Sequence, residues 1–190
     1  MKSRITNCIN ESIKVKKLVL TDTDILYNIE EIIIKSVEAF NADKKMLLCG
    51  NGGSSSDAQH IAAELSGRFY LDRRPLFAEA LHVNSSFVTA VANDYGYDNI
   101  YSRMVEAAGR DGDILIGIST SGNSTNVINA IEKANKIGMT TIGFTGAEGG
   151  KMNDICDVLI KIPSKDTSRI QESHILVGHI ICQLIEEELF

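Results

Sequence analysis

The sequence lacks an excess of basic residues, paired cysteines and any long uninterrupted apolar run. Its 190 residues carry a formal net charge of −6, so no basic surface for nucleic acid is expected. The most apolar stretch, residues 175–185, is interrupted by glycine and polar residues and is shorter than the roughly 18 residues of a membrane span. Four cysteines without C-x-x-C spacing, and no signal-peptide pattern, predict a reduced, cytoplasmic protein.

Proline-rich linkers, internal repeats and low-complexity tracts are also missing, and 44% hydrophobic residues suffice for one core. Short apolar runs predict buried strands at residues 45–49, 77–81, 113–118, 140–144 and 158–162. Helical patterns lie at residues 54–65, 99–108, 124–136 and 169–189. The alternation predicts a three-layer α/β fold with a doubly wound parallel sheet, as a single domain over residues 1–190 that binds ligands beyond the carboxyl ends of its strands.

Two further helices precede the first predicted strand. Residues 25–40 repeat apolar side chains at helical spacing, and residues 4–20 also suit a helix. Two helices cannot form a core of their own, so they must pack on the sheet or on another subunit. Residues 1–41 are therefore predicted to form helices at a subunit interface of an oligomer.

A loop rich in glycine and serine follows the first strand, in the segment CGNGGSSSDAQH at residues 49–60. Gly52, Gly53 and Ser54 let backbone N–H groups and hydroxyls converge on an anion at a helix start. The spacing matches neither a dinucleotide loop nor a nucleoside triphosphate loop. A plain turn, with Ser54 and Asp57 forming a capping box, explains one such loop equally well.

A second loop, ISTSGNS at residues 118–124, repeats the pattern after another buried strand. Ser124 is placed to cap the next helix, which leaves the hydroxyls of Ser119, Thr120 and Ser121 unexplained. Neither loop contains lysine or arginine. Together the two loops predict a sugar phosphate held by dipoles and neutral donors.

Two helices carry side chains that suit acid/base or metal chemistry. His60 and Glu64 are four residues apart and share a helix face, although a surface ion pair is the simpler explanation. On the last helix, Gln171 and His179 lie about 80° apart around the axis, and a buried core histidine is the simpler explanation of His179. Together the four side chains would suit Zn²⁺. Without metal, Glu64 would be a base and His179 an acid.

Other polar residues have plain structural explanations. Asn93 and Asp94 fit an Asn/Asp turn after an apolar helical segment. The acidic run at residues 186–188 fits a solvated helix end, and Arg73 and Arg74 fit exposed loop charges.

Four segments together resemble one known family: CGNGGSSSDAQHIAAELSGR, VANDYGYDNIYSRMVEA, DILIGISTSGNS and SRIQESHILVGHIICQLIE. In this order, over residues 24–190, the chain is similar to the phosphoheptose isomerases of the sugar isomerase (SIS) fold. The resemblance implies a cytoplasmic homotetramer that interconverts sedoheptulose 7-phosphate and D-glycero-D-manno-heptose 7-phosphate. That reaction is the first step towards the ADP- or GDP-heptose of bacterial surface polysaccharide.

The resemblance also implies roles for individual residues, in active sites built at subunit boundaries. Glu64 would be the general base of an enediol mechanism and His179 the general acid. Zinc would be bound by His60, Glu64, Gln171 and His179. The implied substrate contacts are Asn51, Gly52, Gly53, Glu64, Asn93, Asp94, Ser119, Thr120, Ser121, Ser124 and Gln171.

Two features depart from the family pattern. Ser168 stands where some members carry an acidic residue, so it receives no catalytic role, and residues 1–23 match no motif. The alternatives are a non-catalytic SIS relative that associates with a replication initiator, and an SIS enzyme for another sugar phosphate. The presence of both Glu64 and His179 favours the enzyme over the non-catalytic relative.

Overall fold

The computed structural model describes all 190 residues around one parallel sheet, whose strand order is β2-β1-β3-β4-β5. The strands are β1 (Met46–Gly50), β2 (Ala78–Ala80), β3 (Ile114–Ile118), β4 (Thr140–Gly146) and β5 (Val158–Ile162). All five predicted strands are present, and β2 is shorter than its apolar run. The chain leaves β1 for β2 on one side and then crosses to β3 on the other, so the direction of winding reverses between β1 and β3.

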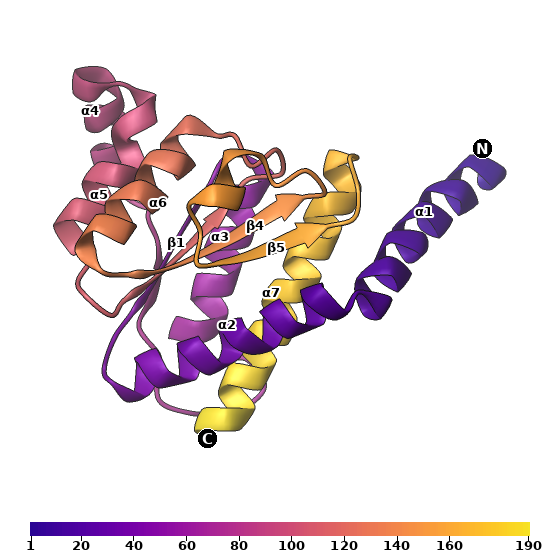
Figure 1. Cartoon of the computed structure of the whole chain (residues 1–190), viewed down its shortest axis with the longest axis horizontal. Helices are drawn as coiled ribbons and strands as arrows, with labels where there is room; N and C mark the ends of the chain where they lie inside the picture. The colour runs from indigo at the N-terminus through magenta and orange to yellow at the C-terminus, as the bar shows by residue number, and fades with distance from the viewer.

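Helices cover both faces of the sheet, which confirms the three-layer, doubly wound prediction (Figure 1). One face packs against α2 (Thr23–Asn41), α3 (Gly53–Ser66) and α7 (Thr167–Leu189). The opposite face packs against α4 (Ser85–Tyr95), α5 (Ile100–Ala108) and α6 (Thr125–Ile137). Two short 3₁₀ helices, η1 (Tyr97–Asn99) and η2 (Gly150–Asp154), lie in the connections.

The two hydrophobic cores follow from the alternation of side chains along each strand. On β1, Met46 and Leu48 belong to the core beneath α2, α3 and α7, whereas Leu47 and Cys49 belong to the core beneath α4, α5 and α6. A strand buried on both faces needs apolar residues at every position, which is why these strands read as continuous apolar runs.

The N-terminal helix α1 (Lys2–Thr21) extends away from the body of the molecule (Figure 1). It buries only Val15 and Val19, whereas α2 packs on β5 and α7. Its exposed large apolar residues are Ile5, Ile9, Ile13, Leu18 and Leu20. No helix in the chain combines the length and apolarity that crossing a bilayer requires.

Glu186, predicted to be solvated at the end of the last helix, is instead buried, with its side chain 2% exposed. Its carboxylate accepts hydrogen bonds from the backbone N–H groups of Phe69, Tyr70 and Leu71. Burial alone would raise the pKa of Glu186, but these donors and the Arg73 guanidinium offset it and hold the pKa below its usual value.

Arg73 completes this buried cluster, and the prediction of an exposed loop charge is wrong for it. Its Nε lies 2.9 Å from Glu186 Oε2, and its side chain is also 2% exposed. Its other nitrogens donate to the carbonyls of Glu64 and Leu65, in the last turn of α3, and to those of Gly67 and Arg74. The Arg73–Glu186 pair therefore ties the end of α3 to the end of α7.

Removing the cation of this pair is expected to be costly, because it leaves a buried carboxylate without its partner. We expect Arg73→Leu to lower the free energy of unfolding by about 3–5 kcal/mol at neutral pH, as measured by urea denaturation. Glu188→Gln, at an exposed position of α7, is the control and should change stability little. Equal stability of Arg73→Leu and the wild type would contradict the role assigned to the pair.

The same pair predicts how stability depends on pH. Because the folded-state pKa of Glu186 is lowered, its stabilisation is present above the pKa of an unfolded glutamate and is lost as the pH falls through the folded-state value. Glu186→Gln should therefore be less stable than the wild type at neutral pH, and the difference should shrink on acidification. A difference that does not change with pH in urea denaturation would argue against an ionised Glu186.

Candidate functional site

The two loops rich in glycine and serine lie at the carboxyl ends of neighbouring strands. β1 pairs with β3 along its whole length, so the loop beginning at Asn51 and the loop beginning at Ser119 leave the same edge of the sheet. At Gly50 a Cβ atom would lie 2.7 Å from the carbonyl oxygen of Ser54, and Gly52 adopts a φ of +57°. Both glycines are therefore needed for the tight turn from β1 into α3.

Asn51 and Asn126 join the two loops through a reciprocal pair of amide hydrogen bonds. Asn51 Nδ2 donates to Asn126 Oδ1 at 2.8 Å, and Asn126 Nδ2 donates to Asn51 Oδ1 at 2.9 Å. Asn126 is buried near the start of α6, and Tyr97 Oη adds a third hydrogen bond to Asn51 Oδ1. The predicted substrate residue Asn51 thus also holds its loop in place. Sequence reasoning missed Asn126, whose only signal is its position two residues after Ser124.

The hydroxyls of the second loop gather into a cluster. Ser119 Oγ lies 2.9 Å from Ser124 Oγ and 3.5 Å from Ser121 Oγ. Ser124 occupies the N-cap position of α6, as predicted, but its side chain bonds to Ser119 instead of capping the helix. The capping box considered for Ser54 does not form either, because Gly52 is the N-cap residue of α3. In neither loop does helix capping use the hydroxyls.

His60, Glu64 and His179 come together from two helices. Glu64 Oε1 lies 3.0 Å from His60 Nε2 and 3.5 Å from His179 Nε2, and one ligand atom from each residue lies within 4.8 Å of the others. The side chain of His60 is 54% exposed, that of Glu64 is 15% exposed and that of His179 is 41% exposed. His179 is therefore not a buried core histidine. The buried one is His174, whose pKa burial lowers to about 4.

Close packing of α3 against α7 brings this cluster together. At Gly178 a Cβ atom would lie 2.6 Å from Ile61 Cδ1, so a side chain there would push the helices apart. Gln171 meets the start of α3, where a Cβ on Gly53 would lie 2.6 Å from Gln171 Nε2. Gln171 thus lies beside the first loop, two turns of α7 before His179.

The donors of the cluster fit a zinc ion. Two imidazole nitrogens and a carboxylate oxygen are typical zinc ligands. Glu64 Oε2 is buried and accepts no hydrogen bond, which leaves an oxygen in need of a proton or a cation. The three residues therefore offer both a metal site and an acid/base pair.

Asp57 belongs to the same neighbourhood and was not predicted as a site residue. Burial raises its pKa, while the charges of His60 and His179 act in the opposite direction. Its Oδ2 atom is also buried without a hydrogen-bond partner. The signal was available in the sequence, since Asp57 lies three residues before His60 and shares its helix face.

Asn93 and Asp94 lie in the last turn of α4, not in a turn outside a helix. Both are exposed, and Asn93 Nδ2 donates to Asp94 Oδ1 at 2.8 Å. Tyr97, three residues after Asp94, donates a hydrogen bond to Asn51, so the end of α4 lies near the first loop. Neither side chain contacts His60, Glu64 or His179 within the chain.

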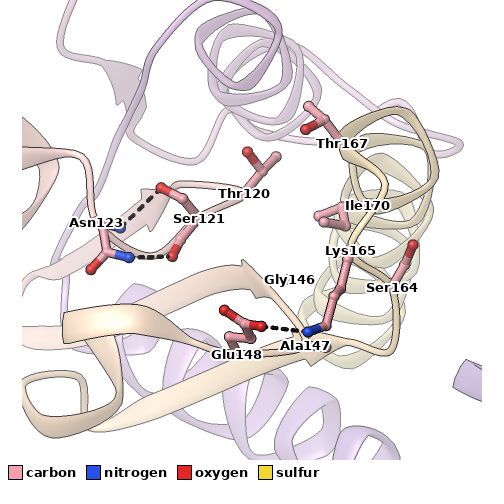
Figure 2. Close-up of a pocket in the computed structure, with 10 residues that line it drawn as sticks. All are labelled: Thr120, Ser121, Asn123, Gly146, Ala147, Glu148, Ser164, Lys165, Thr167 and Ile170. Carbon is pink, nitrogen blue, oxygen red and sulfur yellow. Dashed lines mark hydrogen bonds and ion pairs between the residues drawn. The ribbon is translucent and has the colours of Figure 1, made fainter.

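A cavity of about 220 Å³ opens beside the second loop, between it and the start of α7 (Figure 2). Thr120 and Ser121 line one side, and Thr167 and Ile170 line the other. The remaining lining residues are Asn123, Gly146, Ala147, Glu148, Ser164 and Lys165. Residues of the second loop thus line a space large enough for a small polar group.

Comparison with known proteins extends the resemblance to the whole chain. A family model described as the SIS domain matches residues 13–146. A phosphoheptose isomerase of Aneurinibacillus thermoaerophilus is 51% identical over 190 residues, which cover 100% of this chain and 96% of the relative. One of Clostridium acetobutylicum is also 51% identical, over 100% of this chain and 97% of the relative. The solved structure of a phosphoheptose isomerase from Neisseria gonorrhoeae superposes with a TM-score of 0.92 at 41% identity, covering 98% of both chains.

Because Asn51 and Asn126 join the two loops, mutation of Asn126 should affect both loops. Asn126→Ala should leave the Asn51 amide partly unpaired, lower the free energy of unfolding by about 1–3 kcal/mol and speed amide hydrogen exchange in both loops. Tyr97→Phe removes only the exposed hydroxyl and should have a smaller effect on both measurements. Unchanged exchange in residues 119–124 of Asn126→Ala would show that the pair does not couple the loops.

Proposed function

Because this chain belongs to the phosphoheptose isomerases of the SIS family, we propose that it interconverts sedoheptulose 7-phosphate and D-glycero-D-manno-heptose 7-phosphate. This reaction moves a carbonyl between C2 and C1, which makes the chain an aldose-ketose isomerase. The observation that carries the proposal is the meeting of Glu64 and His179, whose Oε1 and Nε2 atoms lie 3.5 Å apart. A carboxylate and an imidazole are a suitable base and acid for this isomerisation.

Glu64 acts as the base that moves the carbon-bound proton. Its carboxylate, whose side chain is 15% exposed, takes a proton from C1 of the ketose. His179 donates a proton to the C2 oxygen, which gives an enediol. The resulting neutral imidazole takes the proton from the C1 hydroxyl while Glu64 returns its proton at C2. The product is the aldose, and both side chains regain their starting protonation states.

The loops bind the rest of the substrate. Ser119, Thr120, Ser121 and Ser124 supply hydroxyls and backbone N–H groups to the phosphate, at the start of α6 where the helix dipole favours an anion. Holding the phosphate at a distance from the reacting carbons fixes the register of the sugar chain. The remaining contacts to the sugar come from Asn51, Gly52, Gly53, Asn93, Asp94 and Gln171.

Zinc is proposed as the cofactor, bound by His60, Glu64, Gln171 and His179. The support is the close approach of three of these residues and the unpartnered Oε2 of Glu64. When bound, zinc would supply a Lewis acid that polarises the substrate carbonyl. A ring nitrogen of His179 that binds zinc cannot also carry a proton, so with the metal bound His179 would donate from its other ring nitrogen.

A cytoplasmic homotetramer with active sites at subunit boundaries is proposed as the working assembly. Its support is the apolar surface that the single chain leaves exposed on α1, and a groove of about 730 Å³ between α2 and α7. The groove is lined by Leu26, Ile29, Ile33, Ile34, Val37, Ile180 and Leu184 together with three glutamates. In the cell the product would enter the synthesis of nucleotide-activated heptose for surface polysaccharide.

Purified protein should convert sedoheptulose 7-phosphate to the aldose, and Glu64→Gln should lower kcat by about 10²- to 10⁴-fold, because it removes the base. His179→Gln should also lower kcat severely. Glu132→Gln and His82→Gln, which alter the same residue types outside the cluster, are the controls. Near-normal turnover in either cluster variant would remove that residue from the mechanism.

A substrate panel separates the proposed function from its alternatives. A preference for five- or six-carbon sugar phosphates over the seven-carbon substrate would point to another SIS isomerase. Protein that lacks all isomerase activity but binds a replication initiator would belong with the non-catalytic relatives.

Protein prepared without chelator should contain about one zinc ion per chain by elemental analysis. His60→Gln should lower the zinc content, because it removes one nitrogen ligand, whereas His82→Gln should leave it unchanged. Chelation should lower isomerase activity, and added zinc should restore it. Protein free of zinc, with activity unaffected by chelation, would confine the four side chains to acid/base and packing roles.

A further inference from the structure

One cation lines the cavity beside the second loop, and it comes from a different segment of the chain. Lys165 lies in the connection between β5 and α7, and its Nζ is 2.6 Å from Glu148 Oε1 (Figure 2). Among the residues that line the cavity, Lys165 is the only basic one and Glu148 is the only acidic one. Neither loop contains lysine or arginine, so Lys165 is the one cation in the cavity lining that could neutralise a phosphate held by Thr120 and Ser121.

The pair between Lys165 and Glu148 is easily broken. The two side chains are 79% and 73% exposed, and exposed ion pairs contribute little to stability. A phosphate monoester carries more negative charge than one carboxylate, and it also offers three acceptor oxygens. Lysine also has a flexible four-carbon stem, so its ammonium can move from one acceptor to another without movement of the backbone.

Other residues that line the cavity carry unpaired donors. Two hydroxyls, those of Thr120 and Thr167, make no hydrogen bond within the chain. The same holds for the backbone N–H groups of Thr120 and Ser121. Thr120 and Thr167 point toward one another across the cavity (Figure 2). These donors can surround an anion on the sides that Lys165 does not reach.

We propose that Lys165 is a phosphate-binding residue of the substrate site, and that Glu148 competes with the substrate phosphate for it. The inference rests on the proposed function, which supplies the phosphate. In the free enzyme Glu148 neutralises Lys165 at the rim of the cavity. On binding, the Lys165 ammonium leaves the carboxylate and donates to the phosphate, so Lys165 favours substrate binding and Glu148 opposes it.

The two partners of the pair therefore affect substrate binding in opposite directions. Lys165→Gln should raise the KM for sedoheptulose 7-phosphate about tenfold, with kcat changed less than about twofold, because one charge-assisted hydrogen bond far from the reacting carbons is lost. Glu148→Gln should lower the KM about two- to threefold. Inorganic phosphate, tested as a competitive inhibitor, should show the same shifts in its inhibition constant.

Lys136→Gln is the matched control, since it removes an exposed lysine from the far end of α6 and should leave both constants unchanged. An unchanged KM and inhibition constant in Lys165→Gln would overturn the proposal. A rise in both constants in Glu148→Gln as well would mean that the pair only supports the loop, and would also overturn it. Wild-type protein without isomerase activity would reject the proposed function instead, and calorimetric titration with inorganic phosphate would still test Lys165.

Discussion

The candidate site depends on how closely α3 packs against α7. Gly178 allows this approach, because any side chain there would collide with Ile61. The same two helices are joined at their ends by Arg73 and Glu186, which are both buried. Since interiors are densely packed and yield little, this contact fixes the register of one helix on the other. Glu64 and His179 meet because of that register, although they lie far apart in the sequence.

The sheet supplies the second half of the site. Its winding reverses between β1 and β3, so two loops from distant parts of the sequence leave the same edge side by side. The Asn51–Asn126 pair locks them together, and the Ser119 and Ser124 hydroxyls of the second loop bond to each other instead of capping α6. The proposed mechanism separates two tasks: it assigns the anion to the loops and Lys165, and the chemistry at the other end of the substrate to the paired helices. Such separation lets binding energy at the phosphate position the reacting carbons.

Local patterns in the sequence are enough to predict the architecture, the two loops and the pairing of His60 with Glu64. Strands buried on both faces appear as continuous apolar runs, and helical spacing alone places His60 beside Glu64. What could not be predicted depends on partners far away in the chain. Glu186 resembles a solvated helix end because its donors, residues 69–73, are more than 110 positions earlier. Asn126 resembles an ordinary helix residue because Asn51, its partner, belongs to another loop. Spacing within one helix could have identified Asp57, but the packing of α7 was needed to place His179 beside it.

The proposed mechanism requires Glu64 to carry a proton between neighbouring carbons of the sugar, and isomerisation in D₂O follows that transfer. Glu64 is partly exposed, so a proton that it holds can exchange with solvent before it returns to carbon. The account predicts that the aldose formed from unlabelled sedoheptulose 7-phosphate carries deuterium at C2. An aldose formed at the normal rate without any deuterium at C2 would be evidence against proton transfer through the partly exposed Glu64 carboxylate.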